Sequence, residues 1–135
     1  YFMNRRAFLL LSAAVMALPH SASAYSSITF RPDEWSELRS SDATLVMNFR
    51  AKWSLTCQIK LERIATLIAQ NPEYGTLTFV DIDWDTFGQS QMTQRMKVTR
   101  RSTLVVMKQG REVARIVNEP YERKMRAFLD QALAA

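Results

Sequence analysis

Apolar residues follow two different spacings along the chain after residue 24. Short apolar runs bounded by polar or turn residues predict strands. These runs cover 28–30, 43–49, 102–107 and 111–117, and the last two flank a turn that ends at Gly110. A further stretch, 74–83, opens with a glycine turn and continues as a strand run. Apolar residues three or four positions apart predict amphipathic helices, and they recur over 54–70 and 121–133.

Two further helices complete the predicted order of elements. Pro32, with Asp33 and Glu34 directly behind it, suits the first turn of a helix after the first strand. A shorter helix fits 89–97. The order is therefore β-α-β-α-β-α-β-β-α. Strands and helices alternate first, and a hairpin and a final helix follow. We expect an α/β fold with a central mixed sheet and helices on both faces.

The first 24 residues have the pattern of an export signal. Arg5 and Arg6 precede a short apolar run, and Ala22-Ser23-Ala24 fits a signal-peptidase site. The twin arginines followed by Phe8 and Leu9 also fit the signal for export of folded proteins. We expect a periplasmic protein whose mature domain covers 25–135. The alternative is that the segment stays uncleaved as an amphipathic anchor.

Composition and charge narrow the class of protein. The 135 residues, 47% of them apolar, suffice for one domain with a hydrophobic core. Tyr1 and Phe2 precede Met3 and are expected to be an expression remnant. Loss of Arg5 and Arg6 lowers the formal charge from +5 to +3. This mild charge does not indicate nucleic-acid binding. We expect a monomer with no stable membrane association once the signal is removed.

The counts of cysteine and histidine exclude several kinds of site. One cysteine permits neither an internal disulfide nor a cysteine-based zinc cluster. The only histidine, His20, lies in the predicted signal, so the mature domain has no imidazole for Ser-His or Cys-His catalysis. Asp81, Asp83 and Asp85 alternate, but the glycine and closing glutamate of a calcium loop are missing. We expect no metal and no cofactor.

The stretch "RAKWSLTCQIK", residues 50–60, joins a predicted strand to the longest predicted helix. Ser54 is a good N-cap for that helix, and Cys57 then lies one turn inside it. In one interpretation the thiol packs as a small apolar side chain. In the other, the helix N-terminus lowers the pKa of Cys57 and the thiol is reactive. A hydrogen bond from Ser54 would support the thiolate.

This stretch and the element order resemble thioredoxin, whose signature is W-C-x-x-C at the end of a central strand. Trp53 matches the tryptophan, Cys57 matches the second cysteine, and Ser54 stands in place of the first. The stretches "LTFVDID", "STLVVMKQGREV" and "FLDQAL" resemble the family's third strand, last hairpin and C-terminal helix. The resemblance implies a thioredoxin-like fold and thiol–disulfide chemistry, in which the first cysteine attacks and the second resolves the mixed disulfide.

The sequence departs from that family at three places which the resemblance brings to one chemical centre. A buried aspartate is replaced by Asn48, the attacking cysteine by Ser54, and a cis-proline by Ser102. Without proline, a cis bond before Ser102 would cost ~2.5–4 kcal/mol, so we expect it to be trans. An engineered Cys→Ser trap would explain Ser54 alone, so the three changes indicate natural divergence. Ordinary dithiol turnover is not expected.

Two classes of function remain open. In the first, Cys57 forms mixed disulfides with a client protein or with glutathione, supported by Ser54. The resemblance then assigns substrate binding to Trp53, Arg101, Ser102 and Thr103, with the Arg101 guanidinium holding a carboxylate. In the second, the protein is a redox-silent binding or chaperone module that uses the groove between Trp53 and Ser102. Exchange with a cysteine supplied by a second protein is a third possibility, and a solvated Arg101 is the alternative to a binding role.

Overall fold

The computed structural model describes residues 25–135, so the predicted export signal lies outside the described residues. No helix within 25–135 has the length and apolar character needed to cross a membrane. The elements in chain order are β1 (Ser27–Thr29), α2 (Pro32–Ser40), β2 (Thr44–Arg50), α3 (Leu55–Gln70), the 3-10 helix η1 (Pro72–Thr76), β3 (Thr78–Asp83), α4 (Trp84–Phe87), α5 (Gln91–Arg95), β4 (Thr103–Lys108), β5 (Arg111–Val117) and α6 (Glu122–Ala134).

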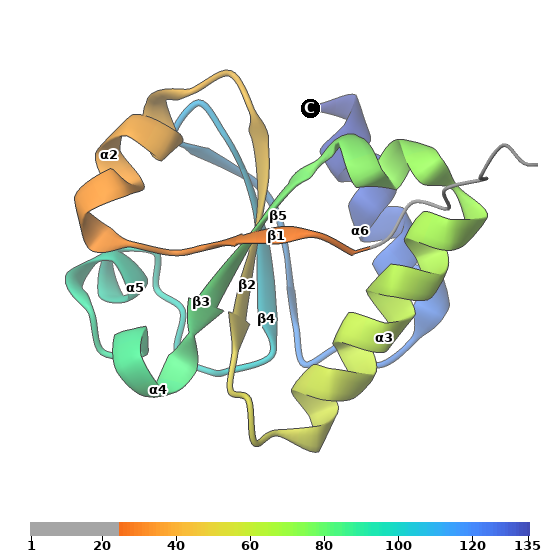
Figure 1. The fold of residues 1–135 in the computed structure, drawn as a ribbon, viewed down its shortest axis with the longest axis horizontal. Helices are drawn as coiled ribbons and strands as arrows, with labels where there is room; N and C mark the ends of the chain where they lie inside the picture. Colours follow the sequence, from red (N-terminus) through yellow and green to blue (C-terminus); the bar gives the residue numbers. More distant parts are fainter. Residues whose placement is uncertain (1–24) are drawn as a thin grey trace, which may run out of the picture.

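The five strands form one mixed sheet in the order β1-β3-β2-β4-β5 (Figure 1). The pairs β1–β3 and β2–β3 are parallel, whereas β2–β4 and β4–β5 are antiparallel. The central strand β2 holds Asn48 opposite Asp81 of β3 and Leu104 of β4. The predicted α/β class and mixed sheet are confirmed.

Helices cover both faces of the sheet and enclose two separate cores (Figure 1). Helices α3 and α6 cover one face, where Val46 packs with Ile64 and Phe128. Helices α2, α4 and α5 lie on the other face, where Met47 packs with Phe30. Neighbouring residues of β2 thus enter opposite cores, and both are fully buried. A strand buried on both faces explains why 43–49 is a continuous apolar run.

Two predicted elements differ in detail from the structure. The stretch 74–83 was expected to open with a glycine turn and to continue as a strand. The turn at Gly75 belongs to the 3-10 helix η1, and Thr78–Asp83 are the strand. Pro72 starts the 3-10 helix, and the side chain of Asn71 caps it by accepting from the backbone of Glu73. The predicted helix 89–97 is the shorter α5, capped by Ser90 and preceded by a separate turn of helix, α4.

Candidate active site

The sequence places the N-terminus of α3 directly after the end of β2. The backbone N–H of Ser54 donates to the carbonyl of Ala51 at 3.1 Å, which closes the connecting turn. The Ser54 hydroxyl then accepts from the backbone N–H of Cys57 at 3.4 Å. The predicted N-cap is therefore confirmed, and it fixes Cys57 on the first turn of the helix.

Ser54→Ala should lower the free energy of unfolding by about 1 kcal/mol, because an N-cap acceptor is lost. Urea denaturation followed by circular dichroism measures the change. Ser54→Asn keeps a side-chain acceptor at the cap and serves as the matched control. Equal loss of stability in both variants would mean that the cap bond is not what Ser54 contributes.

The Cys57 thiol is buried but has polar neighbours. Its side chain is 2% exposed, and its Sγ lies 2.8 Å from the Oγ of Ser102. Burial raises the pKa of the Cys57 thiol, but hydrogen bonds from the hydroxyls of Ser102 and Ser54 and from backbone groups of Ala51 and Ser102 lower it further than burial raises it. The pKa therefore lies below its usual value. A thiol serving only as apolar filler would not need these contacts.

Ser102 is held in an uncommon backbone conformation. Its φ is +61°, in the left-handed region that few residues other than glycine adopt. Its N–H donates to the carbonyl of Phe49 at 2.8 Å, and its carbonyl accepts from the N–H of Asn118 at 2.8 Å. The peptide bond before Ser102 is trans, as predicted, since no cis bond occurs within 25–135. Proline could not replace Ser102 here, because its φ is fixed near −65° and it lacks the N–H.

Lys60 is a site residue that the sequence analysis missed. It lies one turn after Cys57 on α3, is 3% exposed, and donates from its Nζ to the Ser102 carbonyl. Burial lowers the pKa of Lys60 to about 8, while the negative charges of Cys57 and Glu119 act in the opposite direction. A usable signal was present, since position 60 shares the buried face of α3 with Cys57 and Ile64.

The Trp53 and Arg101 side chains stack at the mouth of the site. Trp53 is 63% exposed, and its Nε1 donates to the carboxylate of Asp85 at 3.0 Å. The guanidinium carbon of Arg101 lies 4.8 Å from the centre of a Trp53 ring, a cation–π distance. The Arg101 Nε also donates to the Ser54 hydroxyl at 3.4 Å. The structure thus brings these residues together around the start of α3.

Thr103 stands apart from this group. It is buried at the start of β4, and its hydroxyl donates to the carbonyl of Arg100 at 2.6 Å.

Asn48 is buried on the sheet face that α3 covers. Its amide side chain cannot exchange a proton as a carboxyl group could. Asp81 of β3 lies opposite Asn48 and is an ionisable group on that face. Its carboxylate is already engaged, because it accepts a hydrogen bond from the Tyr25 hydroxyl at 2.7 Å and forms an ion pair with Arg50 at 3.1 Å.

Comparison with known sequences settles the family. The sequence model of the thioredoxin family matches residues 26–131, which is most of the chain. The chain belongs to the thioredoxin family. Membership is consistent with thiol–disulfide redox function. A search of curated protein sequences gives no match.

Solved structures of thioredoxins share the fold. Trxlp from Edwardsiella tarda is 24% identical with a TM-score of 0.66, over 77% of this chain and 98% of that one. Thioredoxin from Trypanosoma brucei brucei is 17% identical with a TM-score of 0.66, over 87% and 100%. A thioredoxin from Nicotiana alata is 23% identical with a TM-score of 0.65, over 84% and 98%. The fold of this thioredoxin-family chain is therefore that of the family.

Residues 96–102 join α5 to β4 and form the Ser102 loop. A polar cavity opens beside this loop. Its volume is about 240 Å³. The lining residues are Thr56, Trp84, Thr99, Arg100, Arg101, Ser102 and Asn118. Two arginines border this cavity, and Ser102 forms both part of its wall and the contact to the Cys57 sulfur. An anionic group bound there would lie next to the loop that shields the thiol. No group of three or more metal-binding side chains occurs within 25–135.

Proposed function

We propose that this thioredoxin-family protein performs monothiol exchange through Cys57, with glutathione or a client protein as the second sulfur. The observation that carries the proposal is the contact between the Cys57 sulfur and the Ser102 hydroxyl at 2.8 Å in a buried setting. Once Cys57 is ionised, its sulfur can only accept, so the Ser102 hydroxyl donates to it and stabilises the thiolate, the nucleophile in disulfide exchange. Lowering of the Cys57 pKa by this and neighbouring hydrogen bonds supports the same conclusion.

The exchange proceeds in two balanced steps. Cys57 first loses its proton to solvent, and the thiolate attacks one sulfur of a disulfide. A bond from Cys57 to that sulfur forms as the old S–S bond breaks, and the other half leaves as a thiolate that takes a proton from solvent. Because the chain has one cysteine, a thiolate from a second molecule must attack the mixed disulfide. Cys57 then leaves as a thiolate, and a new disulfide is released.

Lys60 supports the charge that Cys57 carries in both steps. The thiolate favours the protonated form of Lys60, and this attraction is mutual. The ammonium therefore favours the thiolate by the same free energy. A thiol with a lower pKa is also a better leaving group, so Lys60 assists release from the mixed disulfide. In this proposal Lys60 is a positioning residue, because it acts through Cys57 and Ser102.

The cavity beside Ser102 supports glutathione or an acidic client peptide as the second sulfur compound. Arg100 and Arg101 supply positive charge at its rim, and guanidinium groups bind carboxylates well. Glutathione and acidic peptides carry such carboxylates next to sulfur. Because Cys57 is 2% exposed, the Ser102 loop must move before the sulfurs meet. The reaction should therefore be slower than that of a surface thiol.

Exposure of the folded protein to excess oxidised glutathione tests this proposal. We expect intact-mass spectrometry to find one glutathione per chain at neutral pH, removed again by a reducing agent. The same protein in urea is the control, because its thiol is then accessible and must react. Modification only in urea would contradict the proposal, since the folded thiol would then be inert.

A redox-silent binding module is the second candidate function. The observation in its favour is exposed apolar surface at the start of α3. Trp53 and Leu55 are 63% and 69% exposed, and the Arg101 guanidinium stacks on Trp53. Such a surface suits an extended peptide that carries an acidic residue, and it needs no sulfur. The two candidates differ in their dependence on Cys57.

The proposed setting is an exported, oxidising compartment, and the support is the signal-like sequence of residues 1–24. A lone thiol there meets disulfides more often than reductants. We propose that the domain acts there as a monomer.

A further inference from the structure

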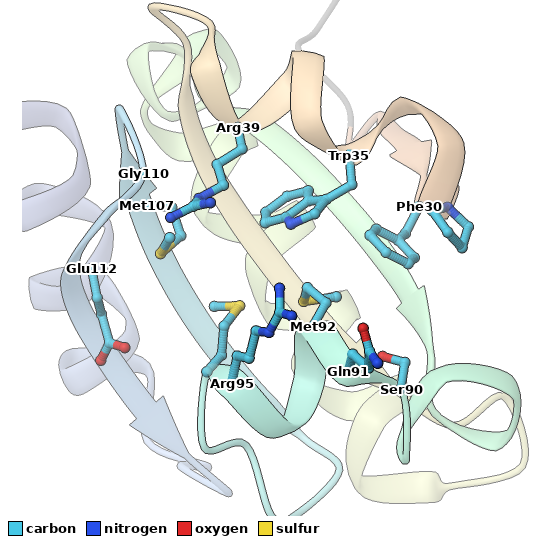
Figure 2. Close-up of a pocket in the computed structure, with 12 residues that line it drawn as sticks. Phe30, Trp35, Arg39, Ser90, Gln91, Met92, Arg95, Met107, Gly110 and Glu112 are labelled. Atoms are coloured by element: carbon cyan, nitrogen blue, oxygen red, sulfur yellow. The ribbon is translucent and has the colours of Figure 1, made fainter.

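A second cavity lies on the side of the sheet opposite α3 (Figure 2). Its volume is about 460 Å³, within the ordinary range of small-molecule sites. Helices α2 and α5 and the β4–β5 hairpin form its walls. Cys57, Ser102 and Trp53 do not line it. An inference about this cavity therefore goes beyond the proposed thiol chemistry.

Part of the cavity wall is apolar and polarisable. Phe30 and Met107 are buried at its base, with Trp35, Met92 and Met96 packed against them. The rings of Phe30 and Trp35 meet edge to face with centroids 5.8 Å apart. Methionine side chains adapt to the shape of a bound apolar group. These walls would accept a short alkyl chain or a ring.

Two arginines supply positive charge to the cavity, whose polar lining also includes Ser90, Gln91 and Glu112. Figure 2 shows the Arg39 side chain of α2 and the Arg95 side chain of α5 extending into the same space beside Trp35. Neither guanidinium forms an ion pair or a hydrogen bond with another residue of 25–135. The one carboxylate in the lining, Glu112, is bound by Arg115 at 2.7 Å. The cavity therefore carries uncompensated positive charge.

The turn of the β4–β5 hairpin lies close to the Arg39 side chain. Gly110 has a φ of +78°, and a Cβ there would lie 3.4 Å from the Arg39 Nε. The absence of a side chain at this turn lets the guanidinium lie close against it. Arg39 thus lies at the edge of the cavity, with its guanidinium beside Met107 and Gly110 (Figure 2).

We propose that this cavity binds a small amphipathic carboxylate, with the carboxylate between Arg39 and Arg95 and an alkyl or aromatic body against the Met and Trp walls. A guanidinium matches the two oxygens of a carboxylate in one plane. The anion also relieves the repulsion between two like charges. An inorganic anion would leave the apolar walls unfilled, and a neutral alcohol would leave both arginines without a partner.

Titration of the full-length protein with octanoate, followed by amide and indole NMR shifts, tests this proposal. We expect saturable shifts of Trp35, of residues 91–96 and of the β4–β5 turn. 1-Octanol, which has the tail without the charge, and acetate, which has the charge without the tail, should each bind at least tenfold more weakly than octanoate.

Arg39→Gln and Arg95→Gln should each raise the octanoate dissociation constant about tenfold, because each removes a charged hydrogen-bond donor. Arg123→Gln removes an exposed arginine on α6 and is the matched control, with no expected change. Cys57→Ser should also leave octanoate binding unchanged, so this site and the thiol site fail or succeed separately. Equal affinity for 1-octanol, unchanged affinity in both arginine variants, or shifts outside the cavity would overturn the proposal.

Discussion

Cys57→Ser should abolish acceleration of glutathione-dependent exchange of a small peptide disulfide, down to the rate in buffer. The variant removes the only sulfur that can form a mixed disulfide, because the chain has no other cysteine. It keeps a hydroxyl-sized group opposite Ser102 and the N-cap at Ser54, so the fold should be retained. The measurement is the exchange rate with protein in catalytic amount, and urea denaturation checks the fold of the variant.

The same variant separates the two candidate functions. If the domain is a redox-silent module, a peptide that binds at Trp53 and Arg101 should bind the variant and the unchanged protein equally. Arg101→Gln is the control for that surface, because it removes the cation stacked on Trp53. An exchange rate that is the same for the variant and the unchanged protein would exclude Cys57 chemistry.

Lys60→Met should lower the rate of Cys57 alkylation at neutral pH about tenfold, which corresponds to a rise of about one unit in the Cys57 pKa. The methionine keeps an apolar stem of similar length and removes the buried ammonium. The Ser102 carbonyl still accepts from the Asn118 N–H, so it is not left without a donor. The Cys57 thiol can take up a proton when the ammonium is lost, so no unpaired buried charge remains. Stability should therefore change little, which distinguishes this effect from unfolding.

The difference in alkylation rate between Lys60→Met and the unchanged protein should depend on pH. Because the pKa of Lys60 is lowered to about 8, its positive charge is lost as pH rises through 8. Cys57 is also fully ionised at high pH in both proteins. The rate difference should therefore be greatest near neutrality and vanish in alkali. Lys52→Met, an exposed lysine before α3, is the matched control and should react like the unchanged protein. A constant difference at all pH values would indicate altered access rather than altered charge.

Local sequence signals predicted the parts of this protein that depend on neighbouring residues. Ser54 was recognisable as an N-cap because capping involves residues three positions apart. The boundaries of α3 followed from its apolar spacing and from Asn71. The glycine turn ahead of β3 was also predicted, but not that it is part of the 3-10 helix η1. Tyr74 lies in η1, and its hydroxyl binds Asp130, which is far away in the sequence.

The contacts that define the site join residues far apart in the sequence. Cys57 and Ser102 are 45 positions apart, and the resemblance to thioredoxin alone suggested that they meet. The positive φ of Ser102 depends on anchors from Phe49 and Asn118, which no local pattern indicates. Lys60 was overlooked because lysine on a helix is usually solvated. Its position on the buried face of α3 was a usable signal, but its contact with the Ser102 carbonyl depends on the packing of α3 against a distant segment.

The pKa of the Cys57 thiol in the folded protein, from the rate of alkylation by iodoacetamide as a function of pH, is the decisive measurement. The proposed function predicts a midpoint clearly below ~8.5, the value for an unperturbed cysteine, with reaction in the absence of denaturant. A midpoint at or above that value, or reaction only after unfolding, would contradict monothiol exchange and make Cys57 a structural thiol beneath a peptide-binding surface.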